Sequence, residues 1–99
     1  MIVVTGSVIA KPECFDEALK LSSEHVARSR KEPGCISHGV TIDSENSMNL
    51  VFFEEWEDMS LLEQHFRVPE SGEFVKALAN LAVSPPKMRV FESKELEIK

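Results

Sequence analysis

Three residues in the middle of the chain carry functional groups that could act together on a small molecule: Glu54, Trp56 and His65. Trp56 is the only tryptophan, and its indole offers a planar substrate a polarizable face and one N–H donor. His65 lies one helical turn after Leu61, so its ring is expected to lean toward the apolar face of its helix. A half-buried imidazole there could accept a phenolic proton. The structural alternative is that Trp56 is a core residue and His65 packs against it.

Glu54 shares the parity of Phe52 and Trp56 on an apolar segment, so its carboxylate is expected to face inward. A buried carboxylate needs a partner, and Arg89 on the last strand is the predicted one. Alternatively, Glu54 lies solvated at the mouth of a pocket. His38, on the preceding strand, could hydrogen-bond a substrate oxygen, although a purely structural role is the favoured interpretation.

No metal or cofactor site is predicted from these residues. The three histidines, His25, His38 and His65, lack the H-x-H or H-x-x-x-H spacing of metal ligands. His25 is expected to be solvated on the flank of the first helix. Cys14 and Cys35 are not spaced as a redox pair, so both are interpreted as structural.

Composition places the chain among ordinary globular domains. Its 99 residues make up one domain, 1–99, and its net charge of −6 argues against binding to nucleic acid. Neither a signal peptide nor a membrane-spanning segment is recognisable, and two cysteines make no disulfide framework. These features predict a cytoplasmic protein that has no membrane partner.

The pattern of apolar residues predicts four strands and two helices, the second of them broken. The first helix follows Pro12 and is ended by Pro33, and the second begins near the capping candidates Asp58 and Ser60 and breaks at Pro69. The predicted strands span residues 2–10, 35–43, 49–57 and 87–97.

The order of these elements predicts an α+β, ferredoxin-like βαββαβ fold: an antiparallel sheet with helices on one face. The third strand is apolar on both faces, with Leu50, Phe52 and Trp56 on one parity and Val51 and Phe53 on the other. Helices can cover only one of these faces. The other is expected to pack against a second copy, which makes the protein a homodimer.

Specific segments strengthen this prediction. Glu32-Pro33-Gly34-Cys35-Ile36 leads into the second strand, and Phe52-Phe53-Glu54-Glu55-Trp56-Glu57-Asp58 runs into Leu62-Glu63-Gln64-His65-Phe66. Together with Pro69 and Phe74, these segments resemble the antibiotic biosynthesis monooxygenase superfamily over nearly the whole chain. The resemblance implies a dimeric α+β barrel with its pocket between sheet and helices. It also implies that the tryptophan of the third strand lies on the pocket wall.

Two departures from the family pattern stand out. His38 occupies a position where relatives commonly carry tyrosine, and Gly39 one where they often carry glutamate. Haem-degrading relatives have an asparagine and an axial histidine where this chain has Gly6 and Leu78, and leucine cannot ligate iron. The resemblance therefore disfavours haem.

The resemblance implies a cofactor-independent monooxygenase that oxidises a quinol or related electron-rich aromatic with O₂. His65 would be the base and Trp56 the stacking wall, with His38, Phe52, Glu54 and Arg89 contacting the substrate. One alternative is an isomerase of a small phosphorylated metabolite, with Lys87 and Arg89 as its cationic cradle. The other is a small-molecule-binding domain without catalysis, which Gly39 and Glu70 would favour.

Overall fold

The computed structural model describes all residues from Met1 to Lys99. Its elements follow the predicted order, with a short 3₁₀ turn before the first helix and the second helix divided in two. Their bounds are β1 Ile2–Ile9, η1 Pro12–Cys14, α1 Phe15–Ser29, β2 Cys35–Asp43, β3 Asn46–Trp56, α2 Met59–Arg67, α3 Pro69–Leu81 and β4 Lys87–Glu92.

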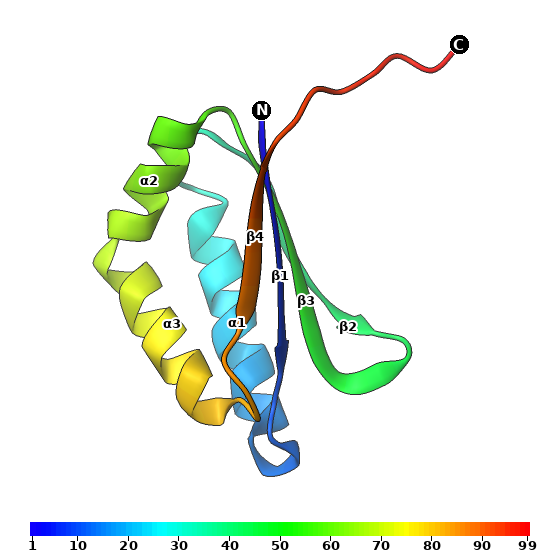
Figure 1. Ribbon diagram of the computed structural model, residues 1–99. Helices are drawn as coiled ribbons and strands as arrows, with labels where there is room; N and C mark the ends of the chain where they lie inside the picture. The colour runs from blue at the N-terminus through cyan, green and yellow to red at the C-terminus, as the bar shows by residue number, and fades with distance from the viewer.

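A single antiparallel sheet has the strand order β2-β3-β1-β4. All three α-helices lie on one face of this sheet, and the other face carries no helix (Figure 1). The predicted ferredoxin-like α+β fold is therefore confirmed. None of the helices is long and apolar enough to cross a bilayer.

The last strand is shorter than predicted. It ends at Glu92 rather than at residue 97, and the chain beyond it leaves the body of the domain (Figure 1). Leu96 and Ile98 are 74% and 98% exposed, so the apolar side chains of this segment find nothing to pack against within the subunit. In the β2–β3 hairpin, β3 begins earlier than predicted, at Asn46, because the Asp43 carboxylate accepts the Glu45 N–H and tightens the turn.

The helices that carry site residues begin and end as local chemistry dictates. Asp58 caps α2 by accepting the Leu61 N–H at 3.0 Å. The Ser60 hydroxyl donates to the Asp58 carboxylate, so of the two capping candidates Asp58 is the cap. Pro69 removes a backbone donor and restrains Val68 to an extended conformation, which separates α2 from α3.

A β-bulge at Ile36 sets the phase of β2. Cys35 pairs with Trp56 and Ser37 with Glu55, so Ile36 is the extra residue between them. Its alternation with His38 predicts a shared face, but Ile36 is 52% exposed whereas His38 is buried. The bulge turns Ile36 outward and leaves His38 on the helix-covered face.

The helix-covered face holds two hydrophobic clusters. The larger lies where β1 and β3 meet α1 and the end of α3, and the smaller where they meet α2. The larger cluster consists of Val8, Ala10, Ala18, Leu50, Phe52, Leu78 and Ala82, and the smaller of Ile2, Val4, Trp56 and Leu62.

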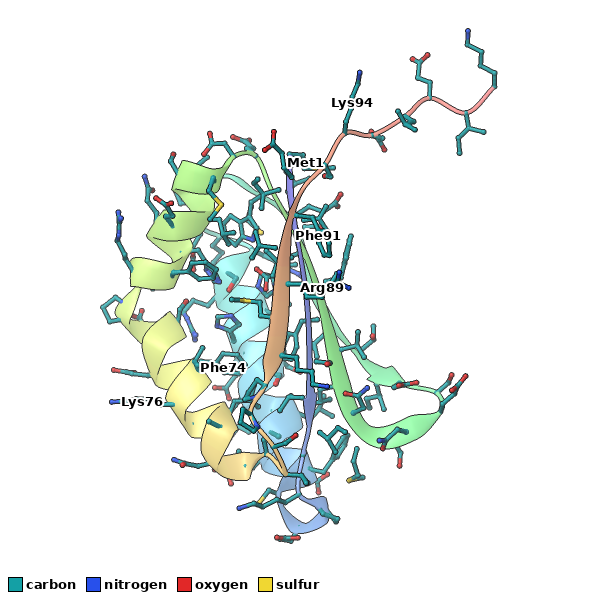
Figure 2. All side chains as sticks on the ribbon, in the orientation of Figure 1. Met1, Phe74, Lys76, Arg89, Phe91 and Lys94 are labelled. Atoms are coloured by element: carbon teal, nitrogen blue, oxygen red, sulfur yellow. The ribbon has the colours of Figure 1, made fainter.

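The uncovered face of the sheet is partly apolar. Phe53 on β3 and Phe91 on β4 are 45% and 37% exposed. Arg89 lies over the Phe91 ring, 4.7 Å from its centroid. Figure 2 shows Arg89 and Phe91 on the side of the sheet away from the helices. The predicted homodimer would use this face, and it stays a prediction.

Candidate functional site

A cavity of about 370 Å³ opens between the sheet and the helices, at the β4 edge. Pockets of this size take a small ligand of one or two rings. Residues of β1, β3, β4, α1, α2 and α3 line it, and Figure 2 shows Phe74 on α3 in the space between that helix and the sheet. Its principal side chains are His25, Phe52, Glu54, His65, Phe66, Ser71, Phe74 and Met88.

Beside this cavity, the fold brings together the three histidines that lie far apart in the sequence. His25 comes from α1, His38 from β2 and His65 from α2, and each is at most 5% exposed. Their ring centroids form a triangle with sides of 5.3, 5.3 and 5.7 Å. One ring nitrogen of each lies within 4.8 Å of the others. The sequence spacing of the histidines therefore did not reveal that their rings lie close together.

The expectation that His25 is solvated is also wrong. Its ring stacks on Phe74 at 4.1 Å with an interplanar angle of 7°. Burial, together with the neighbouring His38, His65 and Arg28, lowers its pKa to about 3. Arg28 Nη2 lies 3.1 Å from His25 Nδ1. Because a guanidinium can only donate, Nδ1 accepts and the proton of this neutral ring is on Nε2.

His65 pairs with a carboxylate that sequence reasoning did not identify. Its Nδ1 lies 2.8 Å from Glu32 Oε1, and this contact holds the proton of the neutral imidazole on Nδ1. Nε2 is left with a lone pair. Glu32 lies in the turn that follows α1, and Gly34, with φ of +83°, leads this turn into β2. The sequence marked the segment Glu32-Pro33-Gly34 as a helix end and as part of the family resemblance, but neither identified Glu32 as the partner of His65.

Glu54 is held by partners other than the predicted one. Its Oε1 accepts the Trp56 indole N–H at 2.9 Å and lies 3.2 Å from His38 Nε2, in an alignment too poor for a hydrogen bond. Burial raises the pKa of this carboxyl, but the adjacent His38 and the Trp56 N–H lower it, and the net direction is downward. Glu54 is therefore an ionised buried carboxylate.

Arg89 does not reach Glu54. It pairs with Thr5 across the β1–β4 ladder, whereas Glu54 pairs with Val4, so the two side chains leave opposite faces of the sheet. The predicted Arg89–Glu54 pair is wrong for this reason. Lys87 lines the cavity but Arg89 does not, so the cationic cradle suggested for an isomerase is not assembled within one subunit.

Trp56 is not on the cavity wall. It is fully buried, and its ring packs against His65 with centroids 4.6 Å apart. The resemblance implies a stacking surface for substrate, but within the subunit Trp56 supports His65 and donates to Glu54 from beneath. His38 also lies behind the wall, whereas Phe52, Glu54 and His65 line the cavity.

Buried polar atoms without a hydrogen-bond partner gather around the histidines. Such atoms are uncommon in folded proteins. Only Asn49 Oδ1, at the hairpin, lies elsewhere. The others are Ser22 Oγ, Arg28 Nε, Glu32 Oε2, His38 Nδ1, His38 Nε2 and Ser71 Oγ.

The amino-acid sequence of this chain is similar to that of known proteins. The family "Antibiotic biosynthesis monooxygenase" matches residues 1–77. An uncharacterized protein of Synechocystis sp. is 33% identical over 96 residues, which are 97% of this chain and 65% of that protein. The chain thus spans about two thirds of the length of this curated relative.

Two solved structures have the same fold. A conserved protein from Methanosarcina mazei has a TM-score of 0.89 and 30% identity, with coverage of 94% of this chain and 92% of the other. A protein from Deinococcus radiodurans has a TM-score of 0.94 and 22% identity, with coverage of 100% and 98%. The latter similarity shows a shared fold.

Proposed function

The chain belongs to the antibiotic biosynthesis monooxygenase family, and from this membership we propose that it oxidises a hydroquinone or a related electron-rich aromatic with O₂. The observation that carries the proposal is the Glu32–His65 pair on the wall of an aromatic-lined cavity. Such a pair is the usual arrangement of an oriented general base.

The first step in this proposal is removal of a phenolic proton. With Glu32 holding the proton on Nδ1, His65 Nε2 has the free lone pair that accepts the substrate proton. The resulting imidazolium is stabilised by the Glu32 carboxylate at 2.8 Å. Trp56 packs against the same ring, so the base is fixed from two sides before substrate arrives.

The phenolate then reduces O₂. It transfers one electron, and the superoxide couples with the ring radical to form a C–O bond. The O–O bond breaks with release of water, and the second oxygen stays on the ring. One hydroquinone and one O₂ thus give one hydroxyquinone and one water, with O₂ as the only oxidant. The protein contributes orientation, exclusion of water and a place for the proton.

The aromatic walls of the cavity suit such a substrate. Phe52 and Phe74 approach each other edge to face, with centroids 6.2 Å apart, and Phe66 lines the same cavity. These rings can flank a planar molecule, the role that the resemblance implied for Trp56. Glu54 is the other charged side chain beside His65 and would repel a carboxylate on the substrate.

The experiment is oxygen uptake by the purified protein with a panel of hydroquinones, repeated with His65→Gln. This variant should lose about 10²- to 10⁴-fold in kcat, the usual contribution of a general base. Glu63→Gln, an exposed change on the same helix, is the matched control and should keep full activity. Uptake that is unaffected in His65→Gln, or that occurs with no hydroquinone of the panel, rejects the proposal.

We propose further that the uncovered sheet face packs against the same face of a second copy. Phe53 and Phe91 are exposed there together, which is costly in a monomer. Light scattering should report a dimer for the unchanged chain and a monomer for Phe53→Glu. Ile98→Glu in the tail should stay dimeric. A monomeric unchanged chain at micromolar concentration would exclude this arrangement.

A further inference from the structure

We propose that His25, His38 and His65 form a binding site for a first-row divalent cation such as Zn²⁺, next to the cavity. The three imidazoles come from three different elements and converge in the interior, where each is at most 5% exposed. Three histidines without a thiolate are the ligand set of catalytic zinc sites, and imidazole also suits Fe, Ni and Cu.

The spacing of the rings fits such a cation. An ion about 2.1 Å from one nitrogen of each ring, in tetrahedral geometry, places the ring centroids roughly 5 Å apart. The observed centroid distances are 5.3, 5.3 and 5.7 Å. The candidate nitrogens lie within 4.8 Å of one another, which is wider than in a filled site. Small ring rotations, without movement of the backbone, would bring them to a common centre.

Two of the three imidazoles have a carboxylate at one nitrogen. Glu32 Oε1 lies 2.8 Å from His65 Nδ1, and Glu54 Oε1 lies 3.2 Å from His38 Nε2. In metal sites, a carboxylate commonly takes the N–H of a histidine whose other nitrogen binds the ion. The Glu32 contact leaves His65 Nε2 as a metal donor. The Glu54 contact is too poorly aligned for a hydrogen bond, so both ring nitrogens of His38 are buried without a partner in the chain and either can bind the ion.

The charges around the cluster also favour a cation. The Glu32 carboxyl lies 2.8 Å from His65, and the Glu54 carboxyl lies 3.2 Å from His38. Two carboxylates therefore face the three rings, and a cation between the rings would be attracted to both.

One side chain opposes the ion. Arg28 Nη2 donates to His25 Nδ1 at 3.1 Å and lies 3.4 Å from the Glu70 carbonyl oxygen. For His25 Nε2 to bind metal, its proton must move to Nδ1, and Arg28 must then transfer its bond to Glu70. Arg28 thus competes with the cation, both through this tautomer and through its positive charge.

A consequence for catalysis rests on the proposed function. His65 Nε2 cannot bind a cation and accept a substrate proton at the same time. The occupied site would therefore lack its base, and the cation would inhibit oxidation reversibly.

Metal binding is tested without substrate. The full chain is freed of metal with a chelator and titrated with Zn²⁺ by calorimetry and with Co²⁺ by visible absorption. One equivalent should bind per chain, with the Co²⁺ spectrum of a site of low coordination number. Excess Zn²⁺ should raise Tm, because it binds only the folded state.

Variants assign the ligands. His38→Gln and His25→Gln should each abolish the stoichiometric site, and Glu32→Gln should weaken it about 10- to 100-fold. Arg28→Met should tighten it about tenfold. Cys14→Ser is the matched control and should bind like the unchanged chain. Circular dichroism and Tm without metal establish that each variant folds.

The proposal is overturned if the unchanged chain takes up no stoichiometric Zn²⁺ or Co²⁺, or if folded His25→Gln and His38→Gln bind as tightly as it does. Loss of binding in Cys14→Ser would assign the metal to the thiol and overturn it as well. Oxygen uptake separates this inference from the proposed function. A chain that binds Zn²⁺ but oxidises nothing contradicts only the function, whereas an active chain that ignores Zn²⁺ contradicts only the metal site.

Discussion

The space between the sheet and the helices has two ends that differ in chemistry although the same strands run through both. Leu50 and Glu54 lie on the same face of β3, and both are buried. Around Leu50 the neighbours are apolar, whereas around Glu54 they are Trp56 and the histidines. The apolar end supplies the burial that stabilises the fold. At the polar end, burial of polar and charged groups costs free energy, but it also places several reactive side chains close together.

Truncation at the apolar end gives the largest expected effect on stability. Leu50→Ala should lower the free energy of unfolding by about 2–5 kcal/mol, because it removes buried methyl groups and leaves a cavity. Oxidation per folded molecule should stay unchanged. Chemical denaturation measures the first quantity and oxygen uptake the second. Ile42→Ala, opposite Leu50 on β2 but 48% exposed, is the control and should cost far less. Equal losses of stability in Leu50→Ala and Ile42→Ala would show that the apolar end does not supply the burial that stabilises the fold.

Trp56→Phe probes the support beneath the polar end. It removes the N–H that Glu54 accepts, and a hydrogen bond to a buried charge contributes roughly 1.5–3 kcal/mol. The free energy of unfolding should fall by at least this amount. In a Glu54→Gln background the loss should be smaller, because the orphaned group is no longer charged. A double-mutant cycle by denaturation checks this difference. Strict additivity would mean that the Trp56–Glu54 contact carries no energy.

Glu32→Gln separates orientation from proton transfer. The amide still occupies the place beside His65 but cannot stabilise an imidazolium with a full charge. We expect about a tenfold fall in kcat, with little change in KM, in the oxygen-uptake assay. Glu55→Gln, on the uncovered face, is the control. A change in KM with an unchanged kcat would show that Glu32 contacts the substrate and does not act through His65.

Two serines of α1 give the smallest effect and the sharpest comparison. Both are fully buried, but Ser29 Oγ donates to the His25 carbonyl at 2.7 Å whereas Ser22 Oγ has no partner. Ser22→Ala should therefore be stabilising, and Ser29→Ala should be less stable than Ser22→Ala by about 1 kcal/mol. Thermal denaturation of both variants measures the difference. A Ser22→Ala variant less stable than the unchanged chain would show that the hydroxyl has a partner in solution.

Much of the fold could be predicted from the sequence because its signals are local. The breaks at Pro33 and Pro69 and the inward parity of β3 all follow from neighbouring residues. The last strand was predicted to continue to residue 97. Because β1 begins at Ile2, which already pairs with Glu92, no partner strand remains beyond that point, and the chain leaves the sheet.

The site was harder to predict because its contacts join distant segments. His25 lies at the right helical spacing from Ala18, Ser22 and Ser29 to share their buried face, and this signal could have identified it. The Glu32–His65 pair spans two elements that no local pattern connects. Arg89 was assigned to the wrong face because β4's phase relative to β1 is fixed by pairing, which the sequence does not display.

The extra residue in β2 has an evolutionary consequence. Because Ile36 is the unpaired residue of the bulge, its loss would leave Cys35 opposite Trp56 and Ser37 opposite Glu55, and His38 would still lie opposite Glu54. A single lost codon would therefore turn β2 into a regular strand. The three imidazoles would stay together, so descendants of this protein can shed this residue and keep the site.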